Sequence, residues 1–154
     1  MARGVHLFDL ARFLTGAEVD NVSAYTDATD NSQVDQLAVG WLGLGDIAAT
    51  LVTSRRLPLS DNRVVVYGER GQCTVRAFTT DGTGTLELFG QTKRAWAVRR
   101  RGNVYATEID DFSRRLGGHD TPSASGLDGL ASMAITRAFQ TSARTGRTIS
   151  VKRD

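Results

Sequence analysis

The chain contains very few of the side chains that form disulfides, metal sites and nucleophilic catalysts. Its 154 residues include one cysteine, Cys73, and two histidines, His6 and His119. A single thiol excludes a disulfide within the chain, and one thiol with two histidines far apart in sequence is too few for a usual zinc site. We therefore expect no metal site, and a reducing compartment, the cytoplasm.

Long apolar segments are also absent. No run approaches the roughly 20 apolar residues that a membrane-spanning helix needs, and Met1 is not followed by the basic and then apolar regions of a signal peptide. We expect no membrane partner. The apolar fraction of 40% and the charged fraction of 23% are ordinary for a globular protein. A chain of this length fits a single domain over residues 1–154 with its own core.

Positive charge is concentrated in one run, although the net charge is only +2. The sequence KRAWAVRRR, residues 93–101, interleaves Trp96 with cations, a pattern that can form a nucleic-acid surface. Its alternation has the period of a strand with mixed faces, and no groove-reading motif accompanies it. We therefore expect no nucleic-acid partner.

The first periodic segment predicts a helix over Val5–Leu14 that ends at Gly16. His6 is expected at the edge of its apolar face, with Asp9 and Arg12 pointing away from that face. The apolar face is expected to contain Leu7, Leu10, Ala11, Phe13 and Leu14.

The middle of the chain favours antiparallel hairpins, because short β-branched segments alternate with turn residues. A long hairpin is expected over Val34–Arg55, with its turn at 43–46. The other strands are expected at Val19–Tyr25, Arg63–Tyr67, Cys73–Phe78, Thr85–Phe89, Arg94–Val98 and Thr148–Val151.

Two helices are expected towards the C-terminus. Thr107 and Asp110 resemble a capping box at the start of the first. Ser125 and Asp128 have the same spacing at the start of the second, and Gly146 is its expected end.

This order predicts an α+β fold with a mainly antiparallel open sheet and helices packed on one face. Consecutive apolar residues at 64–66 and at 41–42 place apolar side chains on both faces of the sheet. The second face therefore needs a cover, and we expect it to form a homodimer or a higher homo-oligomer.

Four segments resemble successive landmarks of the C-terminal domain of the Gfo/Idh/MocA family, NAD(P)-dependent oxidoreductases that act mostly on sugars, inositols and related polyols. They are GVHLFDLARFLTGAEVDNVSA, VVVYGERGQCTV, YATEIDDFSRRLGG and GLDGLASMAITRAFQTSARTGRTISV. SARTGR, Ser142–Arg147, is the most specific match. The resemblance implies an N-terminal Rossmann domain, which carries the nucleotide site and the catalytic lysine, and a C-terminal domain that supplies substrate contacts and the oligomer interface.

The sequence shows no Gly-rich turn between a strand and a helix, which a dinucleotide site requires. We therefore expect no cofactor to bind to this chain, although the resemblance implies NAD or NADP for the full-length family. Two functions stay open. The first is the substrate-binding and oligomerisation domain of an oxidoreductase, inactive alone and separated from a Rossmann partner. The second is a stand-alone dimeric binding or scaffolding module without redox activity.

The resemblance also assigns the candidate site residues. His6 matches the histidine of the family's Asp-x-x-x-His motif, which orients a substrate hydroxyl and helps to move its proton. The acidic position of that motif is Ala2 here, so the pair is incomplete. His119 lies in a loop that can neighbour the substrate in the family, and Asp9 is expected to be structural, pairing with Arg12 or a helix terminus.

Overall fold

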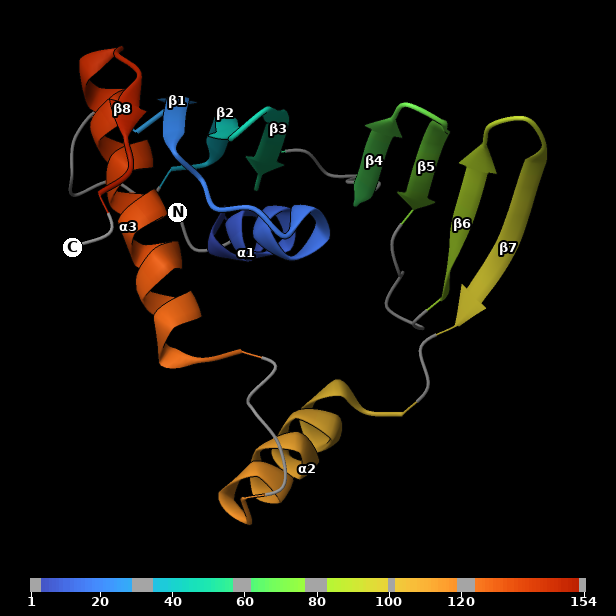
Figure 1. The fold of residues 1–154 in the computed structure, drawn as a ribbon. Coiled ribbons are helices and arrows are strands. Elements are labelled where there is room, and N and C mark those ends of the chain that lie inside the picture. Colours follow the sequence, from blue (N-terminus) through green and yellow to red (C-terminus); the bar gives the residue numbers. More distant parts are fainter. Residues whose placement is uncertain are drawn as a thin grey trace. The chain divides into compact units, whose positions relative to one another are not determined.

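The computed structural model of the chain describes residues 4–28, 35–56, 62–76, 83–99, 102–118 and 124–152. These residues form three helices and eight strands, and every strand pair among them is antiparallel (Figure 1). The expected α+β fold is confirmed. The described strands form two four-stranded sheets, where one open sheet was expected.

The chain divides into two compact units, Met1–Pro58 with Ser123–Asp154, and Leu59–Pro122. The first unit joins segments from both ends of the sequence. The single domain expected over residues 1–154 stays a prediction, and the two units are described separately below.

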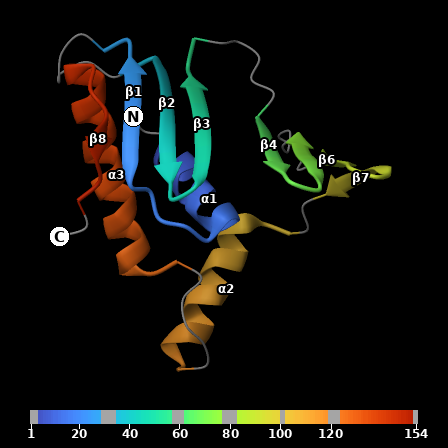
Figure 2. The ribbon, with the colours of Figure 1, turned by 45° about the horizontal axis from the view of Figure 1, so that its top comes forward.

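The first unit is a sheet in the order β3-β2-β1-β8 with two helices. α3 packs against β1 and β8, and α1 packs against α3 and β3; both ribbon views show α3 alongside β1 (Figures 1 and 2). The elements of this unit are α1 Gly4–Thr15, β1 Asn21–Thr26, β2 Leu37–Leu44, β3 Ile47–Ser54, α3 Gly126–Thr145 and β8 Ile149–Ser150.

The long hairpin is confirmed as β2 and β3. Leu44 pairs with Ile47, so the turn consists of Gly45 and Asp46. Gly45 has a φ of +59°, a left-handed conformation that glycine adopts at little cost. Asp20 fixes this end of the hairpin, because one of its carboxylate oxygens accepts a hydrogen bond of 2.9 Å from the Gly45 N–H.

The core of the first unit lies between the helices and the inner face of the sheet. The inward residues of β2 are Ala38, Gly40, Leu42 and Leu44, and all four are buried. Phe139 of α3 is fully buried and meets the ring of Phe8 on α1, with 5.4 Å between the ring centroids. A Cβ atom placed on Gly40 would collide with the Phe139 ring. Glycine at position 40 therefore lets α3 lie close to β2.

The buried face of α1 differs from the expected one. Phe8 is 0% exposed and anchors the helix, whereas Phe13 is 81% exposed. Leu14 is exposed too. The prediction that Phe13 and Leu14 face the core was therefore wrong: the core-facing side of α1 carries Phe8, which helical spacing sets well away from Phe13.

The second unit contains the sheet β4-β5-β6-β7 and the helix α2. Apolar residues in register make one face of this sheet, including the row Val64, Val75, Leu86 and Trp96 across all four strands. The elements of this unit are β4 Arg63–Gly68, β5 Gly71–Arg76, β6 Thr83–Phe89, β7 Lys93–Arg99 and α2 Val104–Leu116.

The caps of α3 agree with the sequence, whereas the start of α2 does not. Ser125 and Asp128 form the expected capping box, and Gly146 ends α3 with a left-handed φ of +66°. α2 begins three residues before the expected Thr107 cap, because the side chain of Asn103 accepts a hydrogen bond from the Tyr105 N–H. An Asn side chain can accept a hydrogen bond from a backbone N–H of the first helical turn as a Thr side chain can. Asn103 comes earlier in the chain than Thr107, so the helix starts after Asn103.

Gly40→Ala is predicted to lower the free energy of unfolding by about 1–3 kcal/mol, because the added methyl group forces the Phe139 ring to move in a packed core. The measurement is urea denaturation. Gly129→Ala is the matched control, since a Cβ at Gly129 meets nothing within 4 Å. Gly129 lies in the first turn of α3, where alanine should instead raise the stability by up to about 1 kcal/mol. Equal stability of the Gly40→Ala variant and the wild-type chain would contradict this account of the α3 contact.

Candidate functional site

The histidine that the sequence selects lies on α1. His6 is in the first turn and a half of this helix, and its side chain is exposed. Asp9 follows one turn later and is exposed as well. Because residues three apart lie on the same side of a helix, the two side chains leave α1 on the same side. The exposed side of α1 thus carries a proton-exchanging imidazole next to a carboxylate.

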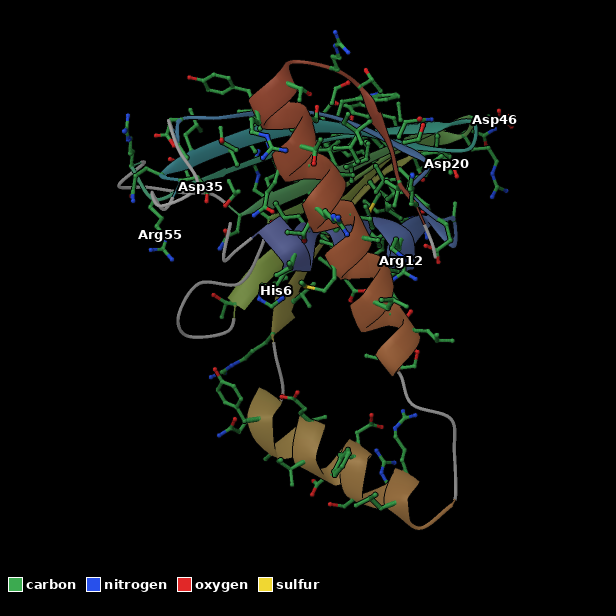
Figure 3. The ribbon with its side chains drawn as sticks, turned by 90° about the vertical axis from the view of Figure 1, so that its left-hand side faces the viewer. His6, Arg12, Asp20, Asp35, Asp46 and Arg55 are labelled. Carbon is green, nitrogen blue, oxygen red and sulfur yellow. The ribbon has the colours of Figure 1, made fainter. Side chains whose placement is uncertain are left out.

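Arg12 holds this helix in place. Its guanidinium donates two hydrogen bonds to Glu18, Nε to Oε2 at 2.9 Å and Nη2 to Oε1 at 2.7 Å. Further donations reach Asp9 at 3.3 Å and Asp128 at 3.2 Å. Only 11% of the Arg12 side chain is exposed. Figure 3 shows Arg12 beside α3, with His6 at the other end of α1. Arg12, Asp9, Glu18 and Asp128 are called the Arg12 cluster below.

The charges of the Arg12 cluster stabilise one another. The hydrogen bonding that Arg12 donates to Glu18 is the main reason that the pKa of Arg12 is raised above its ordinary value, against the opposing effect of desolvation. The pKa of Asp128 is lowered, first by the hydrogen bonds that it accepts from the backbone and side chain of Ser125 and then by Arg12. Asp128 therefore has two functions: it caps α3 and receives Arg12 from α1.

Sequence reasoning placed Asp9 correctly and missed the rest of the Arg12 cluster. The expected pairing of Asp9 with Arg12 is confirmed. Arg12 was expected to point away from the packed side of α1, which is wrong, because its long side chain reaches Asp128 on α3. The sequence signal that could have predicted this contact is the capping carboxylate of Asp128, because a carboxylate attracts a cation on a neighbouring helix.

The other residues that the sequence singles out lie outside the described residues or on elements of the second unit. Ala2 and His119 lie outside the described residues. Asp111 of α2 makes ion pairs with Arg115 at 2.8 Å and with Arg114 at 3.6 Å. Cys73 lies in β5, as expected for a strand residue.

The outer face of the first sheet is apolar and open. Tyr25, Val39 and Val52 form one row across β1, β2 and β3, and all three are exposed. Trp41 lies in the next row, and its ring covers Gly43, where an added Cβ would lie 2.9 Å from Cη2. α3 covers the opposite face, which carries the core. The alternation of β2 therefore separates a core face from a second apolar face.

The starts of α2 and α3 do not fit a dinucleotide. Such a site needs free N–H groups at a helix start after a strand, facing a pyrophosphate. Asn103 already accepts the Tyr105 N–H at the start of α2, and Asp128 adds a carboxylate at the start of α3. A second negative charge next to that carboxylate would be repelled.

Two further classes of site find no support in the part of the chain that the structure describes. No group of three or more His, Cys, Asp or Glu side chains there could hold a metal ion. Among the same residues, no helix combines the length and the apolar character needed to cross a membrane.

Comparison with known proteins gives a consistent family. The model of the GFO/IDH/MocA C-terminal domain matches residues 1–74. The uncharacterised oxidoreductase YrbE of Bacillus subtilis is 28% identical over 162 residues, which cover 99% of this chain and 48% of that protein. Inositol 2-dehydrogenase of Rhizobium meliloti is also 28% identical over 162 residues, which cover 96% of this chain and 48% of the dehydrogenase.

A solved structure supports the same fold. The oxidoreductase from Agrobacterium radiobacter, crystallised with NAD+, L-tartaric acid and magnesium, has a TM-score of 0.74 at 20% identity, covering 97% of this chain and 48% of that protein. The α+β fold with this element order is thus one found in oxidoreductases.

Fold and comparisons point to one class of similar proteins, α+β domains of oxidoreductases. The resemblance to the C-terminal domain of the Gfo/Idh/MocA family is confirmed, with the family match on residues 1–74. The chain spans about half the length of the curated relatives it matches.

Removal of the Asp128 charge is predicted to flatten the acid dependence of stability. The pKa of Asp128 is lowered in the folded chain from an ordinary value of 3.8, so the ionised form stabilises the fold above that pH. This stabilisation is lost as the pH falls from 3.8 through the folded pKa. Urea midpoints of Asp128→Asn measured from pH 7 to pH 2 should therefore fall less steeply than those of the wild-type chain.

Asp46→Asn is the control for this measurement, because it removes a carboxylate in the β2–β3 turn, outside the Arg12 cluster. Its acid dependence should follow the wild-type curve. Parallel curves for Asp128→Asn and the wild-type chain would contradict the assignment.

Proposed function

We propose that the chain is the substrate-binding and oligomerisation domain of an NAD(P)-dependent oxidoreductase that acts on a sugar, an inositol or a related polyol. The observation that carries the proposal is the exposure of His6 on α1, at the position that the resemblance gives to the family's substrate histidine. The name of the Rhizobium meliloti relative, inositol 2-dehydrogenase, supports the polyol class.

His6 would contact a hydroxyl of the polyol. A neutral imidazole can accept the hydroxyl proton on one nitrogen while the other nitrogen donates a hydrogen bond, which suits a hydroxyl that is oxidised to a carbonyl. The acidic partner of the family motif is Ala2 here, which can neither accept nor donate a proton. His6 in this chain therefore orients the hydroxyl without the usual relay, and a Rossmann domain would supply the hydride acceptor and the lysine.

His119 belongs to the same proposal as a second substrate contact, which the family resemblance implies. The cytoplasm stays the predicted compartment.

The outer face of the first sheet supports homo-oligomerisation. An exposed row of Tyr25, Val39 and Val52 next to Trp41 forms a contiguous apolar surface, and such surfaces mark protein interfaces. A second copy fits this face, because a two-fold axis brings the same aromatic and aliphatic side chains against each other.

A stand-alone dimeric binding module without redox activity is the second candidate. The alanine at position 2 favours it, because a redox enzyme of this family uses an acidic residue there. This module would share the outer face with the first proposal and would differ in having no polyol site at His6.

The polyol proposal predicts saturable binding of myo-inositol to the chain. In a nuclear magnetic resonance titration, millimolar concentrations of myo-inositol should shift the His6 imidazole signals. The His119→Asn variant assigns these signals. His6→Asn should weaken binding about tenfold, the value of one hydrogen bond. NADH added to the chain alone should show no saturable fluorescence enhancement. Unshifted His6 signals in the folded chain would favour the binding module.

The interface proposal predicts a light-scattering mass near twice 16.7 kDa. Val52→Glu places a charge in the outer face, where Val52 is 61% exposed, and should shift the mass to that of a monomer. Leu127→Glu on α3 is the control, since this residue is exposed to a similar extent and belongs to the helix on the opposite face. A monomeric mass for the wild-type chain at high concentration would contradict the proposed interface.

A further inference from the structure

α1 is tied to α3 at two points, one apolar and one polar. Phe8 meets Phe139 in the core, with 5.4 Å between the ring centroids. Arg12, one turn later on α1, reaches the Asp128 carboxylate at the start of α3 at 3.2 Å. The two contacts lie on the same side of α1, because residues four apart in a helix are stacked along it.

A single contact between two helices leaves a rotation open. A ring packed on a ring can slide and pivot with little change in buried area, because dispersion and hydrophobic contacts carry no direction. A guanidinium held by carboxylates has fixed hydrogen-bond directions, and both Glu18 oxygens are used in a fork. Arg12 therefore adds a directional restraint to the apolar packing of α1 against α3 and β3.

The fixed rotation determines where His6 points. His6 lies six residues before Arg12 on the same rigid helix, so any turn of α1 about its axis moves the imidazole by the same angle. Asp9, one turn from His6, is held by Arg12 as well, at 3.3 Å. The Arg12 cluster thus sets the direction of both polar groups on the exposed side of α1.

We propose that Arg12 is a positioning residue for the polyol site: it locks the rotation of α1 on α3 through Asp128 and so aims His6 at the substrate hydroxyl. The claim that His6 meets a polyol hydroxyl rests on the proposed function. The claim that Arg12 fixes the rotation of α1 rests on the geometry of the Arg12 cluster. Arg12 need not touch the substrate for this role.

The test compares four single variants and one double variant of the full chain at a temperature where each is folded. Arg12→Met removes the lock, and Arg12→Lys keeps one charged contact while losing the fork to Glu18. Asp128→Asn removes the charge that receives Arg12 on α3. Ser125→Ala is the matched control, because it weakens the same cap of α3 and leaves the contact between Arg12 and Asp128 intact.

Residual dipolar couplings of the α1 and α3 amides report the orientation of α1 relative to α3, including its rotation about its own axis. The His6 signals report myo-inositol affinity. Arg12→Met should turn α1 relative to α3 and weaken myo-inositol binding about tenfold, because small misplacements of a positioned group cost much of its effect. Arg12→Lys should recover part of both. The double variant Arg12→Met with Asp128→Asn should bind myo-inositol no more weakly than Arg12→Met alone, since both changes break the same contact between Arg12 and Asp128.

The outcomes separate the two proposals. An unchanged angle of α1 in Arg12→Met overturns the lock, whether or not the chain binds myo-inositol. If the wild-type chain does not bind myo-inositol but α1 is turned in Arg12→Met, the proposed function is overturned. The contact between Arg12 and Asp128 then still fixes α1, but it has no role in polyol binding. Ser125→Ala matching Arg12→Met in angle and affinity would assign the effect to the cap of α3 and overturn the inference. If Arg12→Met fails to fold, Arg12→Lys and Asp128→Asn decide by the same measurements.

Discussion

The contact between Phe139 and its two neighbours is the constraint on which the rest of the first unit depends. The Phe139 ring occupies the space above Gly40 on one side and meets Phe8 on the other. One side chain of α3 therefore fixes the height of that helix over the sheet and the place of α1 beside it. Packed interiors transmit such constraints, because no void is left to absorb a shift. The position of His6 follows from this contact, since α1 carries it.

Local signals in the sequence gave correct elements. Ser125 and Asp128 predict the start of α3 because a capping box uses backbone groups three residues away, and Gly146 predicts its end for the same local reason. The hairpin turn at Gly45 and Asp46 was also predictable, because two turn residues between alternating apolar runs leave few other solutions. These features need no knowledge of tertiary contacts.

Tertiary contacts decided the points where sequence reasoning failed. Helical periodicity gave α1 a broad apolar side, and it could not rank Phe8 above Phe13, because only the position of Phe139 on α3 makes one of them core. The Arg12 contact with Asp128 joins residues 116 positions apart, so no local pattern contains it. Of the candidate site, His6 and the pairing of Asp9 were predictable, and the lock that orients them was not.

The strand β2 relates the two proposed roles of the first unit. Its inward residues Gly40 and Leu42 support α3, and through α3 and Arg12 they support the helix that carries His6. Its outward residues Val39 and Trp41 lie in the proposed interface. Because side chains alternate strictly along a strand, neither set can change register without the other. Association through the outer face would therefore stiffen the same strand on which α3 rests, so the orientation of His6 and the oligomeric state share one structural support.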